Sequence, residues 1–394
     1  MGGPSQTSLW KPLSELFQLV VADSQAAEHA AGLGLRVGVL GAAMDPPAIE
    51  QAKVHALELS SHLLAKIDEV YSLDPAIPHM NGAFLKSWYV PMVFDQATTA
   101  SLRLIAAEKF HSEDGGFVGI LLHEDVTEAS RAISQFGRMR GIPVLHIPHA
   151  NHFLQPGTDD IHCQINSDFI GVYGEYMRQW YLKCGASEAQ IELIGGAQWD
   201  DLYDKERIPE RLHSRRALGY KEDDFIVAAA TTWFQDTGVW GRGNEDLEWM
   251  AHRFLHACKK LNAKPLIKLN PGEPDERHKD WMDTMLAYGL HGSISKWHNE
   301  MTYSAADVMV VFGPSNLGVA AQIAGCPIVE LMIPSARYPE AYGIPATWGD
   351  ELEDCILAAR GSARNDQFIR DMNYDNDGGA VKRAVDWVRK HTGV

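Results

Sequence analysis

Short apolar runs alternate with longer segments of helical spacing along most of the chain. Each run contains five to seven residues and ends at glycine, proline or polar residues, which predicts strands buried on both faces. The segments between the runs repeat apolar residues three and four positions apart, which predicts helices. This order of strand, helix and strand recurs in both halves, so the pattern predicts an α/β fold with parallel sheets. The clearest runs are 117–122, 142–147, 225–230, 306–312 and 327–331.

The first part of the chain is less regular. Runs at 17–22 and 36–40 flank a short alanine-rich helical segment, which predicts a first strand–helix–strand unit. Apolar spacing predicts helices over 48–70 and 95–110. The stretch 71–92 between them contains prolines and an Asn–Gly pair, so we expect a loop there.

Two successive α/β halves predict two Rossmann-like domains that face one another across a cleft. The chain has 394 residues, which is more than one ordinary hydrophobic core holds. We place the N-terminal domain at 1–203, a charged linker at 204–222 and the C-terminal domain at 223–375. The segment 376–394 has the pattern of an amphipathic helix that could pack back on the N-terminal domain.

Composition narrows the classes of partner. The formal net charge of −17 disfavours an extended nucleic-acid surface, which needs clustered lysine and arginine. No apolar stretch approaches the length of a membrane span, and the N-terminus lacks the pattern of a signal peptide. The five cysteines are scattered and form no C-x-x-C motif, so we expect them to be unpaired in a reducing cytoplasm.

A histidine cluster follows the run 142–147. His146, His149 and His152 fall within seven residues, where the run gives way to Pro-His-Ala-Asn-His. The carboxyl ends of parallel strands meet at one edge of a sheet, where ligands bind, so this cluster is a candidate site. A single histidine in such a loop more often bonds the backbone, and only the cluster as a whole favours a function. The run 117–122 ends on the same edge in the polar residues His123, Glu124 and Asp125.

A second candidate site follows the run 306–312. There Gly313, Pro314, Ser315 and Asn316 lead from a strand into a helix of small residues. The free N–H groups and the positive dipole at the start of a helix can bind phosphate without basic side chains. Ser315 would also be the N-cap, which is its commonest role and is compatible with phosphate binding. Other polar residues expected at strand ends of this sheet are Lys268, Asn270, Thr231 and Thr232.

Several catalytic motifs are absent from the sequence. It contains no G-x-x-x-x-G-K-[ST] phosphate loop, no G-x-S-x-G turn and no G-x-G-x-x-G after its first strand. His123 and Glu124 do not begin a complete H-E-x-x-H motif. A metal held by the three histidines of the cluster lacks an identifiable carboxylate partner. We therefore expect no metal and no cofactor.

Three stretches resemble a known superfamily. GIPVLHIPHANHF with the following SDFIGVYGEYMRQWYLKCGASEAQIELIGGAQWDDLY resembles the end of the N-terminal domain in GT-B-fold glycosyltransferases and their relatives. PLIKLNPGEP is similar to their K-x-H-P-x-E stretch, and VFGPSNLGVAAQIAGCPIVEL to their S-S-x-x-x-E-A helix. The nearest groups are capsule-polysaccharide transferases, CDP-glycerol glycerophosphotransferases and UDP-N-acetylglucosamine 2-epimerases. The likeness covers roughly 117–203 and 224–335.

The chain departs from these motifs at four places. Asn270 replaces the histidine of the His-Pro pair, and Gln322 stands near the acidic residue of the helix. Only Ser315 of the paired serines is present, and His149-Ala150 replaces His-Gly. The fold therefore carries over better than the substrate does.

The resemblance implies a division of labour between the domains. The N-terminal domain would bind a hydroxyl-bearing acceptor, with His149 as general base and Glu124 or Asp125 orienting or replacing it. The C-terminal domain would bind a nucleotide-sugar, with its diphosphate at Gly313, Ser315 and Asn316. A sugar-nucleotide epimerase or hydrolase of the same fold and an inactive binding relative remain open alternatives. Other residues expected in the cleft are His123, His152, Gln322 and Gly195.

Overall fold

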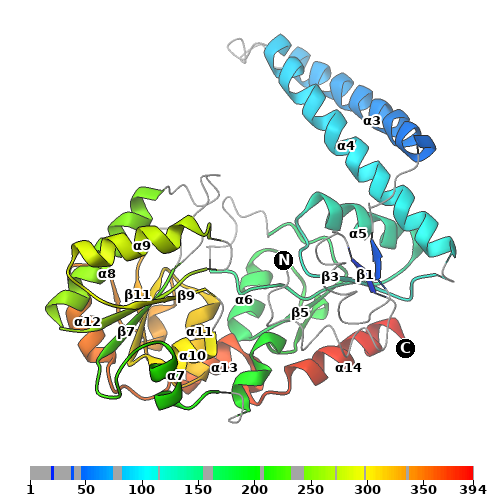
Figure 1. The fold of residues 1–394 in the computed structure, drawn as a ribbon. Helices are drawn as coiled ribbons and strands as arrows, with labels where there is room; N and C mark the ends of the chain where they lie inside the picture. The colour runs from blue at the N-terminus through cyan, green and yellow to red at the C-terminus, as the bar shows by residue number, and fades with distance from the viewer. Residues whose placement is uncertain are drawn as a thin grey trace.

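The protein is a mixed α/β structure in which the strands of each sheet run parallel (Figure 1). This computed structural model describes residues 19–21, 37–39, 46–73, 82–113, 116–153, 163–204, 208–231, 244–270, 273–296, 299–333 and 337–393. Two larger sheets form two lobes, and a parallel pair of short strands, β1 (Leu19–Val21) and β2 (Val37–Val39), forms a third, separate sheet.

The N-terminal lobe is built on four parallel strands in chain order. Most of their residues are apolar, which suits a parallel sheet covered by helices. Helix α5 (Glu128–Arg140) begins at Thr127, whose side chain accepts a hydrogen bond from the Ser130 amide, and ends at Gly141 in the left-handed conformation. The strands are β3 (Ile120–Leu122), β4 (Val144–His146), β5 (Phe169–Val172) and β6 (Ile191–Leu193), and α6 (Glu175–Lys183) follows β5.

The C-terminal lobe contains six parallel strands in the order β12-β11-β10-β7-β8-β9. The chain therefore runs outward from β7 to β9, returns to the middle at β10 and runs outward on the other side. The point of reversal, between β7 and β10, is where doubly wound sheets open a ligand crevice. The strands are β7 (Ile226–Ala230), β8 (Lys264–Lys268), β9 (Ser293–Ser295), β10 (Val308–Phe312), β11 (Ile328–Leu331) and β12 (Ala346–Thr347).

Helices follow the strands of this lobe in sequence. The segment predicted as a linker contains one of them, α7, which packs against α10. Arg215 of α7 is buried, and it holds this helix to the lobe by donating to Asp307 at 2.9 Å and to the Ala305 carbonyl at 3.1 Å. The helices are α7 (Arg211–Ala217), α8 (Asn244–Lys260), α9 (Glu276–Ala287), α10 (Asn299–Ala305), α11 (Asn316–Ile323) and α12 (Leu352–Ala359).

A long helical hairpin projects from the N-terminal lobe (Figure 1). It consists of α3 (Pro46–Leu73) and α4 (Gly82–Glu113), which pack along one another. The prediction of a loop over 71–92 is wrong for residues 71–73, which belong to α3, and for residues 82–92, because α4 continues through Pro91. Local proline signals were overridden by the pairing of the two helices.

The end of the chain returns to the N-terminal lobe. After α13 (Asp366–Met372), helix α14 (Ala380–Thr392) begins where both carboxylate oxygens of Asp200 accept backbone N–H groups, from Ala380 at 3.1 Å and Val381 at 2.7 Å. Farther along α14, the His391 ring stacks on Phe169 of β5 with centroids 3.8 Å apart. The amphipathic pattern of this segment thus corresponds to a helix packed against the four-stranded sheet of the N-terminal lobe.

Candidate functional site

The start of α11 lies at the carboxyl end of β10, beside the reversal point of the sheet. Gly313 turns the chain there with φ 74°, and an added Cβ would lie 2.8 Å from Ile333, so only glycine fits. The Ser315 hydroxyl accepts a hydrogen bond from the Leu317 amide at 3.0 Å. Ser315 is therefore the N-cap of α11, and the positive end of the helix dipole faces the edge where the strands end.

Tyr338 forms hydrogen bonds with both backbone groups of Ser315 at this helix start. Its buried hydroxyl accepts a hydrogen bond from the Ser315 amide at 2.8 Å and donates to the Ser315 carbonyl. Burial raises the pKa of Tyr338, so the hydroxyl keeps the proton that it donates. Gly318 leaves room for the Tyr338 hydroxyl, since an added Cβ would lie 2.3 Å from it. Sequence reasoning missed Tyr338, because no local motif marks a partner 23 residues away.

The loops after β3 and β4 bring three of the predicted residues together. The Glu124 carboxylate contacts Nδ1 of His149, and the rings of His123 and His149 lie edge to face with centroids 5.4 Å apart. The His149 side chain is 46% exposed, so a substrate hydroxyl can reach its ring. Burial, helped by the neighbouring His149, lowers the pKa of His123 to about 4 and keeps its ring neutral.

Asp125 and His146 lie behind this group, in the interior. One Asp125 oxygen accepts the Asn166 amide at 2.8 Å, the Ser167 amide at 3.1 Å and the Ser167 hydroxyl at 3.0 Å. His146, at the end of β4, is buried, and burial lowers its pKa to about 3. Its Nδ1 is 3.9 Å from Asp125. These contacts make Asp125 the anchor of residues 166–167 before β5, and they leave His149 with Glu124 as its carboxylate partner.

The two lobes meet where the β4 loop touches α11. The backbone N–H and the side-chain Nδ2 of Asn151 both donate to Oδ1 of Asn316, at 3.1 Å and 3.3 Å. Phe153 follows in the same loop and packs against Tyr176 of the N-terminal lobe and Tyr338 of the C-terminal lobe, with ring centroids 5.9 Å and 5.4 Å away. The loop that carries His149 is thus held against the start of α11.

A third group lies at the carboxyl ends of β7 and β8. The backbone N–H of Asn270 donates to the Thr231 hydroxyl at 3.0 Å and to the Glu273 carboxylate at 2.9 Å. The Thr231 hydroxyl also contacts the Glu273 carboxylate. Lys268 is buried, and its ammonium donates to the carbonyls of Leu269 and Lys296, each at 2.7 Å. Burial lowers the pKa of Lys268 to about 8. The predicted neighbour Thr232 lies outside the described residues.

Comparisons with known proteins identify the fold of the chain. No protein-family model and no curated protein matches the chain. Among solved structures, a putative UDP-N-acetylglucosamine 2-epimerase from Listeria monocytogenes is similar at 14% identity and a TM-score of 0.52, covering 77% of this chain and 86% of that one. The Anabaena protein HepE, solved with UDP-glucose, is similar at 11% identity and a TM-score of 0.53, covering 100% of this chain and 95% of that one.

A UDP-N-acetylglucosamine 2-epimerase from Methanocaldococcus jannaschii, solved with UDP-N-acetylglucosamine and UDP, is similar at 14% identity and a TM-score of 0.51. The aligned part covers 74% of this chain and 82% of that chain. The chain has the GT-B fold. The resemblance found in the motifs is therefore confirmed at the level of the fold, with two facing α/β lobes and parallel sheets.

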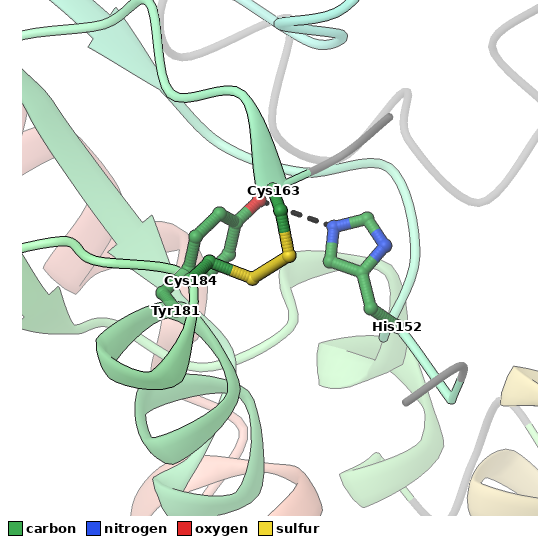
Figure 2. Close-up of a disulfide and its surroundings, with 4 residues drawn as sticks. All are labelled: His152, Cys163, Tyr181 and Cys184. Atoms are coloured by element: carbon green, nitrogen blue, oxygen red, sulfur yellow. Dashed lines mark hydrogen bonds between the residues drawn. A yellow bond between two sulfur atoms is a disulfide. The ribbon is translucent and has the colours of Figure 1, made fainter. Parts of the chain in front are cut away.

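Three residues expected in the GT-B cleft make packing contacts. Gln322 is buried, donates to the Cys326 carbonyl at 3.2 Å and accepts the Asn365 amide at 3.0 Å. Gly195, with φ 85°, lies where an added Cβ would collide with Ala380 of α14. His152 packs on Trp180 with ring centroids 4.5 Å apart, and its Nε2 is 3.1 Å from the Tyr181 hydroxyl (Figure 2). The Gln322 and His152 side chains contact residues of their own lobe, and Gly195 leaves room for α14.

The expectation of five unpaired cysteines is wrong. Cys163 and Cys184 form a disulfide beside His152 and Tyr181 (Figure 2). The bond ties the chain after the β4 loop to the end of α6. The pairing was invisible in the sequence because the two residues are 21 positions apart and belong to different elements. Cys258, Cys326 and Cys355 are free.

Among the residues that the structure describes, no group of three or more His, Cys, Asp or Glu side chains is arranged to hold a metal ion. No described helix combines the length and the apolar character needed to cross a membrane.

Proposed function

We propose that this GT-B protein is a glycosyltransferase that moves a sugar from a nucleotide-sugar to a hydroxyl-bearing acceptor. The observation that carries the proposal is the contact of Asn151 with Asn316. It holds the loop of His149 against the first turn of α11, so a base and an anion-binding helix start share one interlobe region. A transfer from a sugar diphosphate needs these two groups within reach of one substrate.

The diphosphate would lie at the start of α11. The positive dipole at the start of the helix attracts anions, and the Asn316 side chain adds a donor. Tyr338 and Gly318 hold Ser315 in place, so the donors are preorganised. A site of this kind suits a protein whose net charge is −17, because it requires no cluster of basic side chains.

His149 would act as the general base. Its ring takes the proton of the acceptor hydroxyl while the hydroxyl oxygen forms a bond to the anomeric carbon of the sugar. The bond between that carbon and the phosphate oxygen breaks, and the nucleoside diphosphate leaves with the electron pair. Glu124, in contact with Nδ1 of His149, stabilises the imidazolium that forms. The charge of the leaving group is met by the start of α11.

The similar structures support the class of substrate. HepE was solved with UDP-glucose, and the Methanocaldococcus jannaschii enzyme with UDP-N-acetylglucosamine and UDP. They also support the second candidate function, a sugar-nucleotide epimerase or hydrolase, since two of them are named as 2-epimerases. An inactive binding relative is the third candidate, because Asn270 and Gln322 replace ionisable groups of the family motifs.

The test begins with thermal-shift and calorimetric titration of UDP, CDP, GDP and their common sugar conjugates. Binding of one nucleotide series is the expected result, and no binding by any series contradicts the proposal. The bound nucleotide-sugar is then incubated with and without a panel of sugar acceptors and followed by proton NMR. Glycosylated acceptor supports the transferase. A new epimer or free sugar without acceptor supports the second candidate, and binding without any product supports the third.

A further inference from the structure

The contact between Asn151 and Asn316 fixes the orientation of both side-chain amides. A backbone N–H can only donate, so the Asn316 atom that faces the Asn151 amide must be the oxygen Oδ1. The same oxygen lies 3.3 Å from the side chain of Asn151, which must therefore present Nδ2 to it. The remaining atoms, Oδ1 of Asn151 and Nδ2 of Asn316, are directed away from this contact.

The Asn151 oxygen is left without a partner. Asn151 is only 5% exposed, and its Oδ1 is buried with no hydrogen bond from the described residues. A buried carbonyl without a donor loses its hydration with no compensation, so native proteins seldom keep one that has no role. A bound molecule with a hydroxyl or N–H group at this place would satisfy it.

The surroundings define what such a molecule carries. On one side, Asn316 Nδ2 and the start of α11 offer donors and a positive dipole to anionic oxygens. On the other side, Asn151 Oδ1 offers an acceptor. A nucleoside diphosphate sugar carries a hydroxyl-bearing sugar ring bonded directly to its β-phosphate, whereas a nucleoside diphosphate alone has only its ribose, on the side of the α-phosphate. The pair of asparagines is thus complementary to the junction between phosphate and sugar.

We propose that Asn151 is a specificity-determining residue whose amide oxygen accepts a hydrogen bond from a hydroxyl of the sugar attached to the diphosphate. The inference rests on the proposed function, because it assumes that a nucleotide-sugar binds at α11. The acceptor is rigidly placed: both donors of Asn151 are held by Asn316, and Phe153 anchors the loop between Tyr176 and Tyr338. His149 lies two positions earlier in the same loop, so recognition of the sugar and placement of the base would be linked.

The experiment compares UDP, UDP-glucose and UDP-N-acetylglucosamine by isothermal titration calorimetry. Asn151→Ala removes the acceptor, and Asn151→Leu removes it while keeping the approximate volume. Both keep the backbone N–H that contacts Asn316. Asn166→Ala is the matched control, since the side-chain Nδ2 of Asn166 donates to the backbone carbonyls of Asp125 and Gln164 within the N-terminal lobe. UDP binding reports in each variant whether the helix start is still intact.

We expect both Asn151 variants to lose affinity for the sugar nucleotide by roughly ten-fold or more, while their affinity for UDP changes by less than about three-fold. The ratio of the two dissociation constants is the quantity that decides. An equal loss for UDP and the sugar nucleotide would mean that Asn151 only holds the helix start, and an unchanged ratio would mean that it does not touch the sugar. Either result overturns the inference alone. A wild-type protein that binds no ligand of the UDP, CDP or GDP series overturns it together with the nucleotide part of the proposed function, and binding confined to the CDP or GDP series moves the same comparison to that nucleotide.

Discussion

The Glu124 carboxylate contacts Nδ1 of His149, which joins the polar ends of two neighbouring strands into one unit. Glu124 follows β3 and His149 follows β4, and the two strands pair in parallel with Leu122 opposite His146. The contact leaves Nε2 as the ring nitrogen available to a substrate. It gives the histidine cluster a defined orientation that its sequence does not reveal.

Replacing His149 tests its role as the base. We expect His149→Ala to lower kcat by about 10²- to 10⁴-fold, which is the usual contribution of a general base. The dissociation constant of the nucleotide-sugar should change little, because the start of α11 is untouched. Glu124→Gln should have a smaller effect, since it weakens the stabilisation of the imidazolium without removing the base. Steady-state kinetics and calorimetry measure both quantities. His62→Ala, on the exposed face of α3, is the control, and a His149→Ala enzyme with normal kcat rules out the assignment.

The fit of Gly318 under Tyr338 can be tested by adding one methyl group. Gly318→Ala places a Cβ 2.3 Å from the Tyr338 hydroxyl. It should therefore displace this hydroxyl from its hydrogen bonds with Ser315. We expect UDP to bind roughly ten-fold more weakly, which corresponds to about 1.4 kcal/mol. Tyr338→Phe removes the hydroxyl that the methyl group would meet. The double variant should therefore bind UDP no more weakly than Tyr338→Phe does alone. Additive losses in the double variant would contradict the steric explanation.

Glu330 is expected to make stability depend on pH. It is buried in β11, its Oε2 accepts the Tyr338 amide at 3.2 Å, and burial raises its pKa from 4.5 to about 7. The folded protein therefore holds this proton more tightly than the unfolded chain does. The associated stability is fully present below pH 4.5 and is lost as the pH rises through about 7.

Glu330→Gln keeps an acceptor for the Tyr338 amide and cannot ionise. Its free energy of unfolding should exceed that of the wild type at pH 8 by on the order of 1–3 kcal/mol, and the two should converge near pH 4.5. Urea denaturation across this range measures the difference. Parallel pH profiles for the two proteins would show that Glu330 does not titrate in this window.

The disulfide between Cys163 and Cys184 should stabilise the folded protein. It closes a loop with a sequence separation of 21 residues, and cross-links of this span contribute about 3 kcal/mol. We expect Cys163→Ser to lower the free energy of unfolding by that amount in oxidising buffer. Wild-type protein treated with dithiothreitol should match the variant. Cys355→Ser, at a free cysteine, is the control. A wild type whose melting temperature does not change on reduction would contradict the expectation.

Most strands of the two larger sheets and the helix start that follows β10 were predictable from the sequence. Strands in parallel sheets are buried on both faces, so 142–147, 225–230 and 306–312 stand out as continuous apolar runs. The structure has strands at Val144–His146, Ile226–Ala230 and Val308–Phe312. The N-cap role of Ser315 was also predictable, because helix capping is a local interaction.

The partners of the polar residues at the strand ends depend on the folding of the whole chain. Asn151 reaches Asn316 across 165 positions, and Asp200 reaches the start of α14 across 180. Lys268 donates hydrogen bonds to two backbone carbonyls. Gln322 forms hydrogen bonds with backbone groups of its own lobe. Such partners depend on the approach of distant segments, which no local pattern encodes. For the same reason the continuation of α4 through Pro91 and the Cys163–Cys184 bond became visible only once the chain was folded.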